Sequence, residues 1–257
     1  MDRIAPSTET GLTQAALEAG LRDLGLTRGA AVEVHSSLSS LGQVEGGAAT
    51  VVDALMAVVG EAGTLAMPAF PISKPLPLTA EEKARGILAK AQLYGLDYDG
   101  PTGMGVIADE LRRRPGAIVG PGFHRVCAWG RDAERLSAGF GALVEADAWA
   151  LLLGVNIERC SSMHHAERVG LPDEVTRCFA IPDDIRRDYP DDIFIQYGRT
   201  PDRAWLKIQA AAEAHGFIKK QAIGQAECRF FKVKSVVGMY EKALRTDPLG
   251  LFGITNR

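Results

Sequence analysis

The sequence predicts an α/β fold in which a central, largely parallel or mixed sheet is flanked by helices. Two observations predict this class. Strand and helix patterns alternate along the chain, and several strand patterns are short apolar runs, as in strands buried on both faces. The chain has 257 residues, of which 46% are hydrophobic, and this is enough to bury a sizeable core. We therefore expect a single domain over residues 1–257.

The first part of the chain predicts a helix followed by one βαβ unit. Apolar residues recur at helical spacing over 12–24, and Gly25 ends this helix. A short strand over 31–34 leads into a polar turn, and a helix follows over 46–59. The strand over 64–70 closes the unit, and we expect its two strands to lie parallel because a crossover helix joins them.

The rest of the chain alternates less regularly. A segment rich in proline and glycine follows the βαβ unit, and a helix predicted over 80–93 interrupts it. The patterns beyond it predict helices over 105–114, 205–215 and 235–244 and strands over 151–155 and 227–233. These elements are enough to extend the sheet and to cover both of its faces.

Composition and charge exclude several classes of protein. The net charge is −3 and the basic residues are spread along the chain, so no nucleic-acid partner is expected. No apolar run approaches the roughly 20 residues of a membrane span, and the N-terminus lacks the apolar region of a secretory signal. The four cysteines lack CxxC spacing, which argues against a disulfide framework. These features predict a cytoplasmic protein, monomeric or homodimeric, without a membrane partner.

Reactive side chains are concentrated in residues 151–170, LLLGVNIERCSSMHHAERVG. An apolar strand pattern ends at a polar turn, and in open α/β sheets such strand ends line the ligand crevice. We expect Ser161 or Ser162 to cap a helix that follows the turn.

Within that helix, His164 and Glu167 are three residues apart and share one face. His165 should point about 100° away from them. A carboxylate beside an imidazole orients it as a general base, although the same pattern also fits a histidine pair that only packs at a helix start.

Four separated segments carry a resemblance to a known family. They are VHSSLSSLGQVEGGAATVVDAL with GEAGTLAMPAF, PTGMGVIADELRRRPGA, FHRVCAWG and LLLGVNIERCSSMHHAERVG. Their order and spacing, with the closing IGQAECRFFKVKSVVGMYEKALRTDPLGLFG, resemble the aminoglycoside 3-N-acetyltransferases, antibiotic N-acetyltransferases that use acetyl-coenzyme A. The resemblance implies an antibiotic N-acetyltransferase-like fold. It also implies acetyl transfer from acetyl-coenzyme A to an amine of an aminoglycoside, conferring resistance, with no metal required.

The resemblance also implies roles for individual residues. The family's Ser-Leu-His-x-Ala-Glu motif stands here as SMHHAE, so His164 is the implied general base and Glu167 its orienting or substrate-binding carboxylate. His124, before Ala-Trp-Gly, is implied to contact substrate or to relay a proton. The residues implied to bind the coenzyme are His35, Ser36, Ser37, Leu38, Met104 and Arg112. Ordinary turn chemistry would also explain the two serines, and a solvated surface charge would explain the arginine.

Acidic residues predict a cationic small-molecule substrate. Between 173 and 192, seven acidic residues face only three arginines, and such a rim would concentrate a polyamine sugar. The predicted substrate ligands are Asp183, Asp184, Asp188 and, in the YDGP turn, Asp99. A solvated acidic loop would have the same composition.

Departures from the family pattern keep other functions open. The Arg-Ser-x-His-Pro stretch before the FHRVCAWG histidine is replaced by Val-Gly-Pro-Gly, and the segment over 131–150 is short, so another small amine could be the acceptor. A zinc protein is a second alternative, because His124, Cys127, Cys160 and His164 are residue types that zinc prefers. A noncatalytic binder of cationic sugars is a third.

Overall fold

The computed structural model describes residues 11–71, 73–95, 97–198 and 202–254. Short 3₁₀ helices are labelled η. The elements in chain order are α1 (Gln14–Leu24), β1 (Ala31–Ser36), η1 (Ser39–Leu41), α2 (Gly47–Val59), β2 (Thr64–Pro68), β3 (Ser73–Pro75), α3 (Ala80–Ala84), β4 (Ile87–Leu93), α4 (Val106–Arg112), β5 (Ile118–Val119), β6 (Val126–Gly130), α5 (Ala133–Leu136), α6 (Phe140–Glu145), β7 (Trp149–Leu153), η2 (Ile157–Arg159), η3 (Ser161–Val169), α7 (Asp173–Phe179), α8 (Asp183–Arg187), β8 (Ile193–Tyr197), α9 (Asp202–Ala214), β9 (Lys219–Ile223), β10 (Ala226–Lys232), α10 (Val233–Thr246) and α11 (Pro248–Phe252).

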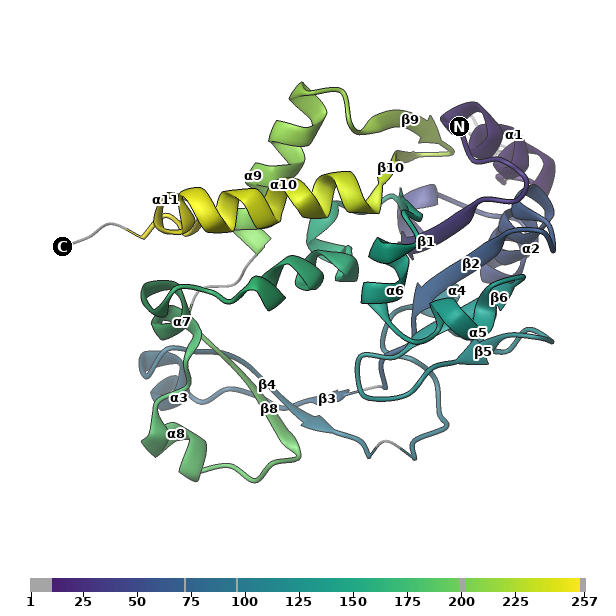
Figure 1. Cartoon of the computed structure of the whole chain (residues 1–257). Helices are drawn as coiled ribbons and strands as arrows, with labels where there is room; N and C mark the ends of the chain where they lie inside the picture. Colours follow the sequence, from purple (N-terminus) through teal and green to yellow (C-terminus); the bar gives the residue numbers. More distant parts are fainter. Residues whose placement is uncertain (1–10, 72, 96, 199–201, 255–257) are drawn as a thin grey trace, which may run out of the picture.

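The larger sheet has seven strands in the order β5-β6-β2-β1-β7-β10-β9. Strand β1 lies parallel to β2 and to β7, whereas the outer strands all join antiparallel. The sheet is therefore mixed, with a parallel centre of three strands, and helices lie on both of its faces (Figure 1). The predicted fold class is confirmed.

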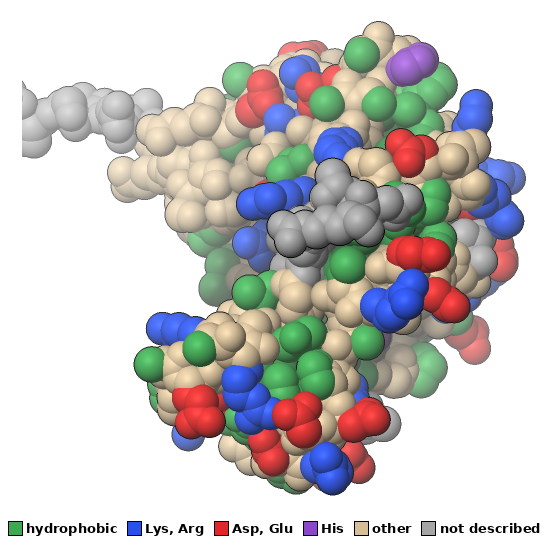
Figure 2. All heavy atoms as spheres, turned by 90° about the vertical axis from the view of Figure 1, so that its left-hand side faces the viewer, with side chains coloured by type: hydrophobic (Ala, Val, Ile, Leu, Met, Phe, Trp, Pro, Cys, Tyr) green, Lys and Arg blue, Asp and Glu red, His purple; other side chains and the backbone are tan. Residues whose placement is uncertain are grey.

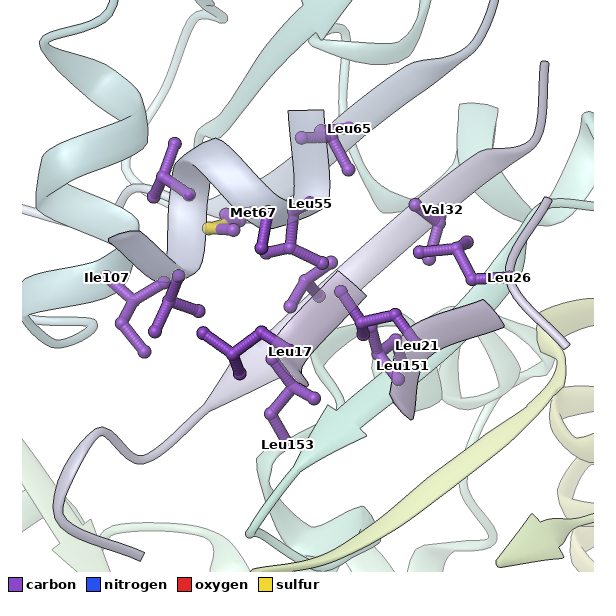
Figure 3. Packing of buried hydrophobic residues seen from close by; sticks show 14 of the residues in the cluster. Leu17, Leu21, Leu26, Val32, Leu55, Leu65, Met67, Ile107, Leu151 and Leu153 are labelled. Carbon is purple, nitrogen blue, oxygen red and sulfur yellow. The ribbon is translucent and has the colours of Figure 1, made fainter. Parts of the chain in front are cut away.

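Strand β7 shows why the sheet needs helices on both sides. Leu151 and Leu153 belong to a core formed with α1, α2 and α4, whose packing is shown in Figure 3. Ala150 and Leu152 point to the other face, into a core formed with η3, α9 and α10. Because successive side chains of a strand alternate between faces, an uninterrupted apolar run such as WALLL can serve both cores.

The first predicted helix shows the capping that its sequence indicates. The helix α1 begins after Thr13, whose side chain accepts a hydrogen bond from the backbone N of Ala16 at 3.2 Å. It ends at Gly25, which adopts a left-handed conformation with φ 118° that favours glycine. The predicted strands and helices of the βαβ unit are present as β1, α2 and β2.

The prediction of one helix over 80–93 is wrong. Only α3 is helical, and Gly86, with φ 91°, separates it from strand β4. The backbone of the segment ILAKAQL instead pairs with β8 and β3 in a separate three-stranded sheet. Long-range pairing therefore outweighs the local helical spacing.

The three-stranded sheet, with α3 and α8, occupies the lower left of Figure 1, apart from the seven-stranded sheet on the right. A small apolar core of Ile87, Ile185 and Ile195 holds it together. In the described part of the chain, we find no helix with the length and apolarity needed to cross a membrane.

Candidate active site

The carboxyl ends of the parallel strands β1 and β7 meet at one edge of the sheet. Ser36 pairs with Leu153 at the end of this register, and the backbone N of Ser37 donates to the Leu153 carbonyl at 3.0 Å. The chain beyond β7 turns at Gly154, where φ is 68° and a Cβ would lie only 2.5 Å from Ser40 Cβ. Only glycine lets the two turns approach this closely.

A cavity of about 900 Å³ opens over these turns. It is lined by the predicted coenzyme residues His35, Ser36, Ser37, Leu38 and Met104, together with the start of α4 and the turn that follows β7. The structure therefore brings five of the six predicted coenzyme residues together. The amide of Ser37, however, is bonded to Leu153, so it is not free to polarise a bound carbonyl group.

Arg112, the sixth predicted coenzyme residue, lies elsewhere. Its guanidinium contacts Asp109 at 3.2 Å and Asp99 at 3.5 Å, and it lines a separate cavity of about 60 Å³. Asp99, a predicted substrate ligand, lines the same small cavity. The guanidinium that does line the large cavity is that of Arg159, which sequence reasoning missed.

A buried hydrogen-bonded cluster lies beneath the turn from His35 to Leu38. His35 Nε2 lies 2.6 Å from Glu33 Oε1, and Ser162 Oγ donates to the other oxygen of Glu33. The Ser161 backbone N is 3.3 Å from His35 Nε2. These contacts tie the end of β1 to the start of η3, so the predicted helix cap by Ser161 or Ser162 is wrong. Instead, the Ser162 hydroxyl and the Ser161 backbone N both contact side chains of β1.

The cluster also bears on the zinc alternative. In the described chain, the only group of His, Cys, Asp and Glu with metal-binding spacing is Glu33, His35 and Cys160. The predicted zinc set is not assembled, because Cys127 packs in the core with α1 and α2, whereas Cys160 packs in the core on the opposite face. Burial raises the pKa of Cys127 to about 12 and that of Cys160 well above its usual value, which keeps both as thiols.

The segment η3 carries the predicted catalytic pair. His164 Nδ1 lies 2.7 Å from Glu167 Oε2, so the predicted proximity is observed. The segment is a 3₁₀ helix rather than an α-helix, and residues three apart eclipse one another there. Tyr240 donates its hydroxyl to Glu167 Oε1 at 3.1 Å. Burial is the main cause that raises the pKa of the Tyr240 phenol, which therefore remains a donor.

His164 lies between two further cavities, each of about 440 Å³. The first, here called the acceptor cavity, is also lined by Glu167, Glu158 and Trp205, and the His164 ring packs edge to face on that of Trp205 with centroids 4.7 Å apart. The second is lined by His124, His165 and Arg168 as well. His165 thus lines the second cavity and not the acceptor cavity, in keeping with the predicted difference in facing.

His124 precedes β6 and is brought near His164 by the fold. Its ring packs edge to face against Phe70, with centroids 5.0 Å apart. Partial burial, and then the neighbouring His164, lower the pKa of His124. A neutral imidazole at this position can both donate and accept a hydrogen bond.

The acidic residues of α8 lie away from both His164 cavities. Asp184 and Asp188 bind Arg85 at 2.7 and 3.0 Å, and neither they nor Asp183 line the cavities beside His164. The lower part of Figure 2, where this small sheet lies, mixes acidic and basic side chains. The predicted acidic rim is therefore a surface whose charges are partly paired, and the structure does not bring Asp183, Asp184 and Asp188 together with His164.

Sequence reasoning also missed Glu158 and Trp205 in the acceptor cavity. Trp205 comes from α9, far along the chain, and its nearness to His164 depends on tertiary packing. Glu158 lies in residues 151–170, the segment singled out from the sequence, but no spacing rule distinguishes it there from a surface glutamate.

Known proteins resemble this chain along most of its length. The family profile described as Aminoglycoside 3-N-acetyltransferase matches residues 34–245. The chain belongs to the aminoglycoside 3-N-acetyltransferase family. Among its curated relatives, the SPbeta prophage-derived aminoglycoside N(3')-acetyltransferase-like protein YokD of Bacillus subtilis is 30% identical over 264 residues, which cover 94% of this chain and 96% of that protein.

Solved structures of the family share the fold. The crystal structure of YokD from Bacillus subtilis has a TM-score of 0.70 at 26% identity and covers 94% of this chain and 96% of its own. The apoenzyme of aminoglycoside acetyltransferase AAC(3)-IVa has a TM-score of 0.72 at 21% identity, and the match covers 95% of this chain and 92% of that one. A binary complex of AAC-IIIb with CoASH has a TM-score of 0.67 at 20% identity, and the match covers 95% of this chain and 99% of that one. The predicted family, fold and acyltransferase class are confirmed.

Proposed function

We propose that this family member transfers the acetyl group of acetyl-coenzyme A to the 3-amino group of an aminoglycoside, with His164 as general base. The observation that supports this best is the contact of 2.7 Å between His164 Nδ1 and Glu167. It directs the other ring nitrogen, Nε2, away from the carboxylate. The acceptor cavity beside this ring adjoins the large cavity over the strand ends, since Glu158 lines both.

The base is needed because an aliphatic ammonium group has a pKa near 10 and is not nucleophilic at neutral pH. His164 Nε2 accepts a proton from the acceptor nitrogen, and Glu167 keeps the proton of the imidazole on Nδ1. His164 then returns the extra proton to solvent. When the acceptor enters as an ammonium ion, the products of the overall reaction are one amide, one free thiol and one released proton.

The large cavity suits the coenzyme. Its turn from His35 to Leu38 and the open start of α4 offer polar groups to a pantetheine arm, and Arg159 offers a guanidinium to phosphates. Acetyl-coenzyme A supplies, when bound, a thioester whose acyl carbon bonds to the amine nitrogen while the carbon–sulfur bond breaks. The sulfur leaves as the free thiol, taking the second proton that the amine nitrogen loses as the amide forms. None of these steps needs a metal ion.

An aminoglycoside acceptor is supported by the relatives. Complexes of mutant AAC(3)-IVa with a gentamicin and with apramycin have the same fold as this chain, at TM-scores of 0.73 and 0.68. Acetylation removes a positive charge from the antibiotic, and we propose that it confers resistance. The cytoplasmic location and the monomeric or homodimeric state stay predictions.

A thiol-release assay tests this function. The purified protein, supplied with acetyl-coenzyme A, should release free thiol in the presence of aminoglycosides that carry a 3-amino group. Matched acceptors that lack this group should give only the background rate. Mass spectrometry of the products should show one added acetyl group.

Two results would contradict the proposal. Acetylation of simple amines without any aminoglycoside turnover would indicate a different acceptor. Tight aminoglycoside binding with no thiol release would indicate a noncatalytic binding protein.

A further inference from the structure

Glu158 lies where two cavities of the active site meet. It lines both the large cavity over the strand ends and the acceptor cavity beside His164. Among the residues that the structure describes, no other is shared by these two cavities. A ligand that reaches from the acceptor cavity toward the coenzyme therefore passes this carboxylate.

The backbone that carries Glu158 is held firmly. The Ile157 side chain is buried, and its backbone N donates to Gln209 Oε1 of α9 at 2.8 Å. The carbonyl of Val155 accepts from Arg229 of β10 at 3.4 Å. Because the chain leading into Glu158 is anchored to α9 and β10, the backbone at Glu158 has a defined place rather than that of a free loop.

The carboxylate of Glu158 has unused capacity to accept hydrogen bonds. Its Oε2 atom is shielded from solvent and, among the described residues, has no hydrogen-bond partner. A shielded, unpaired carboxylate oxygen makes the charge of Glu158 costly, and a cation that binds the carboxylate from the cavities it lines offsets that cost. Glu167, the other carboxylate of the acceptor cavity, already binds His164 and Tyr240 through its two oxygens. Glu158 is therefore the carboxylate of this cavity that is available to a ligand.

We propose that Glu158 binds a second, non-reacting ammonium group of the acceptor and thereby selects amines that carry at least two positive charges. The proposal rests on the proposed function. A carboxylate stabilises the protonated form of an amine, so the group that Glu158 binds is not the nucleophile. The nucleophile is the neighbouring amine, which gives up its proton to His164. Glu158 is thus a specificity-determining residue for polyamine acceptors.

The test compares Glu158→Gln with Glu61→Gln in the full-length chain. Glutamine keeps the size of the side chain and removes its charge. Glu61 is an exposed glutamate in the turn before β2, at the opposite end of that strand from the site. Circular dichroism and the melting temperature confirm that each variant folds. Gentamicin is the probe, and calorimetry measures its binding to each protein.

We expect Glu158→Gln to weaken gentamicin binding by about 10- to 100-fold, as loss of a charge-assisted hydrogen bond does. The KM for gentamicin should rise by a similar factor while kcat changes little. Glu61→Gln should stay within about twofold of the parent, the range expected of a surface substitution. The shorter carboxylate of Glu158→Asp should restore part of the affinity, which a purely structural role would not predict.

Three outcomes would overturn the inference: unchanged gentamicin affinity in Glu158→Gln, a loss confined to kcat, or no gentamicin binding by the parent protein. A loss confined to kcat would make Glu158 a proton acceptor instead. Failure of the proposed function has a different signature. The parent protein would then bind gentamicin and release no thiol, and the binding comparison would still decide the role of Glu158.

Discussion

Replacing His164 by alanine lowers kcat by about 10²- to 10⁴-fold, the range usual for loss of a general base. The ring is exposed to the cavities and, among the described residues, bonds to Glu167 and packs on Trp205, so its removal should preserve folding. The affinity for acetyl-coenzyme A should change little, because the ring does not line the large cavity. Steady-state kinetics with an aminoglycoside and calorimetry with coenzyme A measure the two effects.

His165→Ala is the matched control for this prediction. His165 is the next residue in η3 and lines the second cavity but not the acceptor cavity. Its replacement should cost less than about tenfold in kcat, because it removes no base from the reacting amine. Equal losses in the two variants, or near-normal kcat in His164→Ala, would refute the assignment of the base.

The second large effect is expected at Glu167. Its Oε2 contact fixes the His164 ring with the proton on Nδ1, and without it either tautomer and several orientations become available. We expect Glu167→Ala to lower kcat by about 10²-fold or more, and Glu167→Gln to lower it less, because the amide oxygen still accepts from Nδ1. Kinetics over a range of pH, with melting temperatures, measures this order.

The Tyr240→Phe variant distinguishes the role of Tyr240 in positioning Glu167 from its role in packing the core. It removes only the hydroxyl that donates to Glu167 Oε1 at 3.1 Å and keeps the ring in the core. A decrease of several-fold in kcat is expected, smaller than at Glu167 itself. The account of Glu167 would be wrong if Glu167→Ala retained kcat within about threefold of the parent.

The sequence is informative where short-range rules control structure. Helix α1 has the Thr13 cap and the Gly25 end that its spacing indicates. The His164–Glu167 contact follows from a separation of three residues, and it holds although η3 is a 3₁₀ helix rather than an α-helix. Parallel pairing of β1 and β2 follows from the crossover helix between them.

Other expectations were wrong because they depend on partners far along the chain. The segment over 80–93 has helical spacing, but β8, about a hundred residues further on, pairs with its second half. The acidic residues of α8 carry the charge of a substrate rim, yet Arg85 pairs with Asp184 and Asp188 in the small sheet.

The active site itself shows the same limit. The turn from His35 to Leu38 was singled out by the family resemblance, and the pair on η3 by its spacing and by the same resemblance. What joins them is a buried cluster in which Glu33 of β1 binds Ser162 of η3, and no local pattern links residues 129 apart in the chain. Glu158 was missed for the same reason, since its importance comes from two cavities that meet only in the folded chain.

The most direct test of the account is the structure of a ternary complex with coenzyme A and an aminoglycoside. The central claim is that the large cavity holds the coenzyme and that its thiol meets the acceptor amine beside His164. We expect the sulfur near the turn from His35 to Leu38 and the 3-amino nitrogen within about 3.2 Å of His164 Nε2, the reach of a hydrogen bond. An aminoglycoside bound beside α8, or a coenzyme outside the large cavity, would contradict the claim.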